Sequence, residues 1–239
     1  MESIRLFCLP FAGGSSYSYR LFAQHAPENI EIVPIDPPGR GKRVNETLLD
    51  NLELMAEDLF HQISDQLDQP YAIFGHSMGA LAAYLLSHQI LKHRCPPPLH
   101  LFLSGSGGPL VREKEKIHHL PSALFWKKIK EMEGSPEEVF KDETLMAFFE
   151  PILKADFKAV ETFNYQKRKP FHIPLHIFYG DQDDISDREI KNWSLESTAP
   201  IVYQKFTGTH FFIFDHYQSI LHKISQGLHH YAYRKIGVI

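Results

Sequence analysis

The sequence predicts an α/β fold, in which a mainly parallel central sheet is flanked by helices and carries a helical insertion. Three observations predict it: short apolar runs recur along the chain, helical patterns lie between them, and this alternation lapses at about residues 108–170. Strands that alternate with helices favour a parallel sheet covered on both faces. A length of 239 residues suits a single domain with a sizeable core, so we predict one domain over residues 1–239.

The expected strands are short runs, most of them bounded by Gly, Pro or Asp. Several are almost continuously apolar, as strands buried on both faces must be. They are IRLFCL from Ile4, IEIVPI from Ile30, YAIF from Tyr71, LHLFLS from Leu99, LHIFY from Leu175 and IVYQKF from Ile201.

The expected helices between these strands each show an apolar stripe at spacings of three or four residues. The stripe of the first helix consists of Leu48, Leu52, Met55, Leu59, Ile63 and Leu67. A second helix should run from about Met78 through Leu91, and a last one from about Tyr217 to Tyr233.

The insertion at about residues 108–170 has helical patterns and no convincing strand pattern. In GSPEEVF, Ser135 is the expected N-cap, with Pro136 at the first helical position and Glu138 completing a capping box. Asp142 is expected to cap the next helix. From these patterns alone, the insertion is either a helical hairpin that fills core space or a lid over a substrate.

Composition and charge exclude several classes of protein. A net charge of −4 gives no basic field for binding nucleic acid. Cys8 and Cys95 have no paired spacing, which suits a reducing compartment. The N-terminus lacks a secretory signal, and no run approaches the about 18 apolar residues of a membrane helix. We therefore expect a cytoplasmic protein without a membrane anchor, and a monomer by default.

The stretch YAIFGHSMGALAAYLL interrupts apolar sequence with a G-x-S-x-G pattern centred on Ser77. A strand, a tight turn and a helix form the context of a nucleophile elbow, in which Gly75 and Gly79 avoid collisions with neighbouring backbone. The helix N-terminus at Ser77 favours developing negative charge. The alternative is a glycine-rich turn with a capping serine.

A serine nucleophile needs a general base, and the base needs an orienting acid. His210 follows the last expected strand, and Asp181, Asp183 and Asp184 follow the one before it. We assign the acid to Asp183, with Asp184 as the alternative and Asp181 as a turn former. The order serine, acid, histidine is that of α/β-hydrolases.

Tetrahedral intermediates also need donors to their oxyanion. The N–H of Met78, directly after the serine, is one expected donor. The second should come from the loop PFAGGSS after the first strand, where we favour the N–H of Ala12 over that of Phe11. The alternative for this loop is a plain Gly-Gly turn.

At these residues the sequence resembles the type II thioesterases that accompany non-ribosomal peptide and polyketide synthetases, and the related medium-chain fatty-acyl thioesterases. The resemblance covers nearly the whole chain. It is carried by LPFAGGSS, DPPGRG, GHSMGA, HLPSALF, GSPEEVF, FFEPILKADFKAVETF, GDQDD and GTHFF, in the family's order. The chain departs from the family in LKADF, where an arginine often precedes the Ala-Asp, and at Asp184, where proline is common.

The resemblance implies an α/β-hydrolase with Ser77, Asp183 and His210 as a catalytic triad and the insertion as a mobile lid. It implies hydrolysis of acyl thioesters on the phosphopantetheine arm of an acyl or peptidyl carrier protein, for editing or for chain release. No metal or other cofactor is expected, because the phosphopantetheine belongs to the substrate. The alternatives are a general carboxylesterase or acyltransferase, and a carrier-binding protein without activity.

Overall fold

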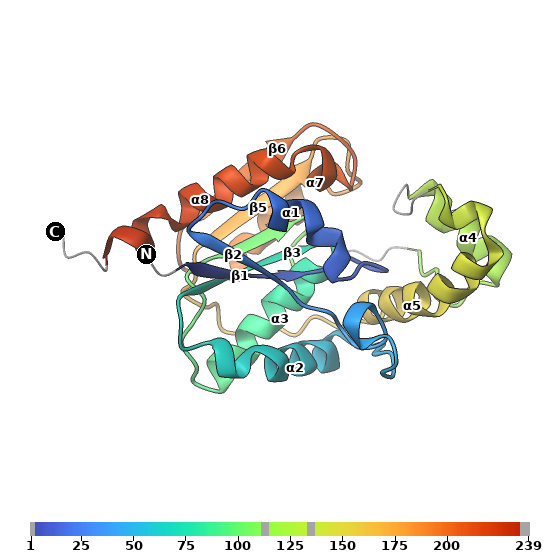
Figure 1. Ribbon diagram of the computed structural model, residues 1–239, viewed down its shortest axis with the longest axis horizontal. Helices are drawn as coiled ribbons and strands as arrows, with labels where there is room; N and C mark the ends of the chain where they lie inside the picture. Colours follow the sequence, from blue (N-terminus) through green and yellow to red (C-terminus); the bar gives the residue numbers. More distant parts are fainter. Residues whose placement is uncertain (1–2, 111–114, 133–136, 235–239) are drawn as a thin grey trace.

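The central sheet is parallel throughout and has the strand order β2-β1-β3-β4-β5-β6 (Figure 1). The computed structural model describes residues 3–110, 115–132 and 137–234. All the expected strands are present, and the predicted α/β class is confirmed. They are β1 (Ile4–Leu9), β2 (Ile30–Pro34), β3 (Tyr71–His76), β4 (Leu101–Ser104), β5 (Leu175–Gly180) and β6 (Ile201–Phe206).

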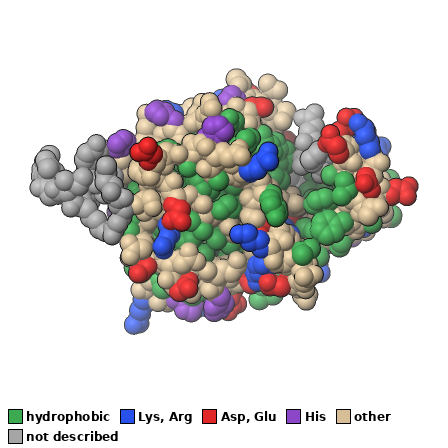
Figure 2. Space-filling model, in the orientation of Figure 1, with side chains coloured by type: hydrophobic (Ala, Val, Ile, Leu, Met, Phe, Trp, Pro, Cys, Tyr) green, Lys and Arg blue, Asp and Glu red, His purple; other side chains and the backbone are tan. Residues whose placement is uncertain are grey.

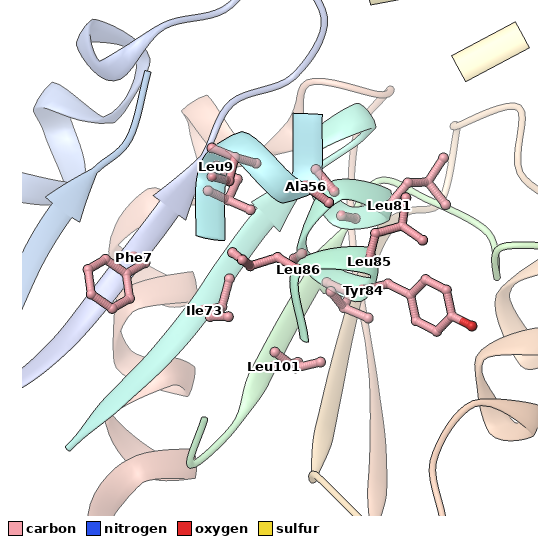
Figure 3. Packing of buried hydrophobic residues seen from close by; sticks show 14 of the residues in the cluster. Phe7, Leu9, Ala56, Ile73, Leu81, Tyr84, Leu85, Leu86 and Leu101 are labelled. Carbon is pink, nitrogen blue, oxygen red and sulfur yellow. The ribbon is translucent and has the colours of Figure 1, made fainter. Parts of the chain in front are cut away.

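Two apolar clusters cover the two faces of the sheet, because successive strand residues point to opposite sides. Phe7, Ile73 and Leu101 face α2 (Leu52–Ile63) and α3 (Met78–Lys92), as Figure 3 shows. Their strand neighbours on the other face pack against α1 (Arg20–Gln24) and α8 (Tyr217–Arg234). This second face includes Cys8, whose thiol pKa is raised by burial, so it is a buried hydrophobe as expected.

The helices that flank the sheet follow the predicted patterns, with two boundaries of the first helix corrected. The predicted stripe runs from Leu48 to Leu67, but α2 ends at Ile63 and begins only at Leu52. The reason is the side chain of Asn51, which accepts hydrogen bonds from the N–H groups of Glu53 and Leu54 and so caps the helix there. The remaining short elements are η1 (Ser16–Tyr19), η2 (Gly41–Arg43), η3 (Ser64–Gln66), α6 (Asp187–Lys191), η5 (Asn192–Leu195) and α7 (Phe212–Asp215).

The described part of the insertion is helical and contains no strand. It consists of α4 (Ser122–Glu131), the short turn η4 (Val139–Lys141) and α5 (Glu143–Glu161). Asp142 caps α5 as predicted, accepting from the N–H groups of Thr144 and Leu145. The predicted helix start at Ser135 and Pro136 lies outside the described residues, and the described residues after it form only the turn η4.

The insertion has an apolar cluster of its own, separate from the two sheet clusters. Figure 1 shows α4 away from the sheet, with α5 leading back toward it. The last turns of α5 belong to the main core through Ala159, whereas Phe125 and Trp126 of α4 pack within the insertion. The insertion is therefore attached to the sheet through the C-terminal part of α5.

Two histidines lie in an aromatic stack beneath α8. The His100 ring stacks on Phe102 at 4.4 Å and the His176 ring on Phe178 at 4.6 Å between ring centroids. Burial lowers the pKa of His100 to about 4, with His176 adding to the effect. Burial likewise lowers the pKa of His176 to about 4, with Lys223 adding to it. Both rings are neutral at pH 7.

Because the pKa of both histidines is lowered in the folded protein, we expect the protein to lose stability in mild acid. In the unfolded chain a histidine titrates near pH 6.5, so between about pH 6.5 and 4 the unfolded state binds more protons. The free energy of unfolding should therefore fall as pH decreases through this window, by about 2 kcal/mol for each ring at pH 4.5. Urea unfolding at pH 7.5 and pH 4.5 measures this loss. A His176→Phe variant should lose correspondingly less, and an unchanged pH dependence in that variant would contradict the assignment.

Candidate active site

Ser77 occupies a strained turn between β3 and α3. Its backbone has φ 56° and ψ −116°, a conformation that residues other than glycine rarely adopt. A Cβ on Gly75 would lie 2.1 Å from the carbonyl oxygen of Gly79, and a Cβ on Gly79 would lie 2.2 Å from that of Leu9. Only glycine fits at either position, so the steric reason for the elbow glycines is confirmed.

The structure brings the predicted serine, histidine and acid into one line of hydrogen bonds. His210 Nε2 lies 2.9 Å from Ser77 Oγ, and His210 Nδ1 lies 2.9 Å from Asp183 Oδ2. Asp183 follows β5, and His210 stands between β6 and α7. The carboxylate is 5% exposed and the imidazole 29% exposed, so the acid is shielded while the ring faces the site.

The loops that carry the acid and the histidine are tied to each other. Asp181 Oδ1 accepts a hydrogen bond of 2.9 Å from the N–H of Gly208. The backbones also approach closely, since a Cβ on Gly180 would lie 2.4 Å from the Gly208 carbonyl oxygen. Asp181 therefore braces the turn as predicted, and the hydrogen bond to His210 Nδ1 assigns the acid to Asp183.

His76 packs directly behind the His210 ring, a contact that the sequence analysis did not identify. The two ring centroids are 5.1 Å apart, and His76 Nδ1 lies 2.9 Å from Ser104 Oγ. Burial holds the pKa of His76 well below its usual range. The ring is therefore neutral, and it supports His210 without placing a positive charge beside it.

A cavity of about 540 Å³ opens onto Ser77. Ala12, Phe11 and Met78, the residues predicted to supply oxyanion donors, lie on its wall. The helices of the insertion supply an apolar side, which consists of Ile129, Met132, Leu153, Phe157 and Val160. Hydrophobic side chains also gather on the surface of this part of the molecule (Figure 2). The cavity thus joins a polar reaction centre to an apolar chamber.

Neither a metal site nor a membrane-spanning helix is found in the described part of the chain. Among residues 3–110, 115–132 and 137–234, no three or more His, Cys, Asp or Glu side chains are grouped so that they could hold a metal ion. None of the helices described combines the length and apolar character that crossing a bilayer requires.

Comparison with known proteins places the chain in a family. The family model described as "Thioesterase domain" matches residues 4–228. The chain belongs to this family. This thioesterase is 32% identical to the gramicidin S biosynthesis protein GrsT of Aneurinibacillus migulanus, over 89% of its own length and 84% of that protein. It is therefore a hydrolase that acts on thioesters, as the resemblance implied.

Two further relatives cover almost the whole thioesterase. The type II thioesterase BorB, from the borrelidin biosynthetic cluster, has 30% identity and a TM-score of 0.87 over 95% of this chain and 93% of its own. The linear gramicidin dehydrogenase LgrE of Brevibacillus parabrevis is 33% identical over 98% of this chain and 92% of its own. The resemblance to type II thioesterases and the α/β-hydrolase fold are confirmed.

Proposed function

We propose that this thioesterase removes acyl groups from the phosphopantetheine arm of a carrier protein through an acyl-Ser77 intermediate. The observation that carries the proposal is the line of hydrogen bonds from Ser77 through His210 to Asp183, which faces a cavity with an apolar side. Thioester carbonyls are less stabilised by resonance than amide carbonyls. An activated serine and two oxyanion donors therefore suffice, without a further cofactor.

The first half-reaction transfers the acyl group to the enzyme. His210 Nε2 takes the proton of Ser77 Oγ while this oxygen bonds to the thioester carbon. The oxyanion accepts hydrogen bonds from the N–H groups of Met78 and Ala12. The C–S bond then breaks, the sulfur receives the proton from His210, and the pantetheine thiol departs. Asp183 stabilises the imidazolium that forms between these transfers.

The second half-reaction returns the free enzyme. His210 Nε2 removes a proton from a water molecule, whose oxygen bonds to the acyl carbon of the Ser77 ester. The same N–H groups hold the new oxyanion, the C–O bond to Ser77 breaks, and His210 returns its proton to Ser77 Oγ. A carboxylic acid leaves. The apolar side of the cavity, which includes Phe157 and Leu153, receives the acyl tail in both halves.

The names of two relatives support a proposal for the biological setting. GrsT belongs to gramicidin S biosynthesis and BorB to the borrelidin cluster. These names support a role beside a synthetase, in editing stalled carriers or releasing chains. We propose in addition that this thioesterase acts in the cytoplasm, with a monomer as the default state.

Dehydrogenase activity, which the name of LgrE suggests, is not favoured. A dinucleotide-binding loop after β1 would read G-x-G-x-x-G and bind pyrophosphate with its N–H groups. Here the loop reads Gly13-Gly14-Ser15-Ser16, and the Gly13 N–H already donates to the carboxylate of Asp156. A carboxylate at that place repels a phosphate.

The carrier assignment predicts a substrate order that kinetics can measure. An acyl group on a phosphopantetheinylated carrier protein should be hydrolysed with a kcat/KM at least about tenfold higher than the same acyl group on N-acetylcysteamine, since carrier contacts add binding energy. The oxygen ester of the same acid should be slower still. If the oxygen ester were the best of the three substrates, the enzyme would be a carboxylesterase.

A further inference from the structure

A buried carboxylate from the insertion reaches the loop that carries the predicted oxyanion donor. Asp156, on α5, is fully buried and accepts a hydrogen bond of 2.7 Å from the N–H of Gly13. The same carboxylate binds both terminal nitrogens of Arg40, with Nη2 at 2.6 Å from Oδ1 and Nη1 against Oδ2. Arg40 is itself 2% exposed, so the ion pair is shielded from water.

The loop after β2 is shaped to aim Arg40 inward. The residues on either side, Gly39 and Gly41, have φ values of 81° and 54°, which favour glycine. Asp36 fixes the loop by accepting from the N–H groups of Ser16, at 2.6 Å, and Lys42, at 3.0 Å. The DPPGRG motif thus connects the loops after β1 and β2 and delivers one guanidinium to Asp156.

A second contact from the same helix holds the same glycine. Gly13 has φ 76°, and a Cβ built on it would lie 2.5 Å from Leu153 Cδ2, one turn before Asp156 on α5. The glycine is also the third residue of a tight turn, closed by a 2.9 Å hydrogen bond from the Gly14 N–H to the Phe11 carbonyl oxygen. Helix α5 therefore contacts the centre of the turn at two points, the N–H and the Cα of Gly13.

We infer that Asp156, held by Arg40, is a positioning residue for the oxyanion site. Ala12 and Gly13 are the two central residues of the turn, so fixing the Gly13 amide restrains the rotation of the neighbouring Ala12 peptide. The Ala12 N–H then stays directed at the place where the oxyanion forms, without reorganisation during the reaction. The inference rests on the proposed function, because it gives Asp156 a role through the Ala12 donor.

If the Arg40–Asp156 pair served only to stabilise the fold, activity and stability would fall together in variants of the pair. Buried ion pairs contribute little net stability, and replacing both partners with apolar residues of similar size is often neutral or stabilising. An apolar pair at 40 and 156 should therefore preserve the fold but leave the Gly13 amide without an acceptor. If the pair positions the oxyanion site, kcat should therefore fall in this variant although the protein remains folded.

The test compares two double variants. R40M/D156L removes the acceptor of the Gly13 amide, whereas R40Q/D156N is neutral but keeps a carbonyl that can accept from it. With hexanoyl-N-acetylcysteamine, we expect kcat of R40M/D156L to fall about 10- to 100-fold with KM little changed. R40Q/D156N should stay within about fivefold of the parent, since one restored acceptor recovers most of the geometry. Urea unfolding should show both double variants to be folded under the assay conditions, with R40M/D156L losing no more stability than one unpaired amide costs.

An inhibitor supplies a readout of the oxyanion itself. A hexyl trifluoromethyl ketone forms a hemiketal with a catalytic serine. Its Ki should therefore rise across the variants by about the same factor by which kcat/KM falls. If R40M/D156L does not fold, Arg40→Lys replaces it, because lysine keeps the charge but loses the two-pronged contact. In that variant kcat should fall several-fold, and the Gly13 amide proton should shift in the NMR spectrum.

The outcomes distinguish this inference from the proposed function. A parent enzyme that hydrolyses the thioester, with R40M/D156L equally active, would overturn the positioning role alone. Equal losses of kcat in both double variants, matched to equal losses of stability, would also overturn it. A parent enzyme without thioesterase activity would instead overturn the proposed function.

Discussion

Replacement of Ser77 by alanine should abolish nearly all thioester hydrolysis, with kcat reduced by about 10⁴- to 10⁶-fold, as for removal of a serine nucleophile elsewhere. The hydroxyl that accepts the acyl group is lost, while the cavity and the Asp183–His210 pair remain. Binding of the acyl-carrier substrate should therefore persist. The measurement is kcat with a hexanoyl carrier, together with its Kd for the variant.

A second serine provides the control for this variant. Ser106 lies after β4, and its hydroxyl donates to the Gly107 carbonyl oxygen rather than to His210. Ser106→Ala should therefore retain activity within about threefold of the parent, because the hydroxyl does not contact the reacting groups. A Ser77→Ala enzyme that hydrolysed the carrier thioester at the parent rate would exclude Ser77 as the nucleophile.

Replacement of Asp183 by asparagine should reduce kcat by about 10⁴-fold without unfolding the protein. The asparagine amide can donate to His210 Nδ1, and this selects the tautomer in which Nε2 carries a proton. That nitrogen can then no longer accept the proton of Ser77 Oγ. The rate constants at pH 7.5, alongside the free energy of unfolding, measure the effect.

The neighbouring acids provide matched controls for the assignment of the third triad member. Asp181→Asn keeps an oxygen that can accept from the Gly208 N–H, so its activity should stay close to that of the parent. Asp184→Asn should likewise have a small effect, because Asp183 makes the contact with His210. A large loss in Asp184→Asn together with a small loss in Asp183→Asn would move the acid by one position.

The sequence was sufficient to predict the sheet and its helices because their signals are local. Strands such as β3 are almost continuously apolar, and each strand's residues alternate between the two faces of the sheet. Helix starts were predictable where a cap was evident, as at Asp142. The start of α2 was misplaced because Leu48 continues the apolar spacing, whereas the capping side chain of Asn51 decides where the helix begins.

The contacts of the candidate site were predictable only in part. Ser77, Asp183 and His210 each follow a strand, and the carboxyl ends of parallel strands meet at one edge, so chain order alone suggested their meeting. The pairing of Arg40 with Asp156 joins residues 116 positions apart, from a loop and from a helix. No local spacing signals that contact, although Arg40 lies in DPPGRG and Asp156 in FFEPILKADFKAVETF, two of the segments that carry the family resemblance.

The insertion has contacts that fit each of the two readings its sequence left open. The C-terminal part of α5 packs in the main core and holds Gly13, as a structural hairpin would. Residues of α4 and α5 also line the cavity, as a lid would. Pro151 lies between the capped start of α5 and Asp156, and it removes one backbone hydrogen bond inside the helix.

Trapping of the acyl-enzyme shows directly whether Ser77 carries the acyl group during turnover. The parent enzyme is mixed with a hexanoyl carrier, quenched in acid on the millisecond scale, digested and examined by mass spectrometry. We expect a hexanoyl group on the peptide that contains Ser77, formed and lost at rates that match turnover. A hexanoyl group that turns over on another residue instead would contradict the assignment of Ser77 as the nucleophile.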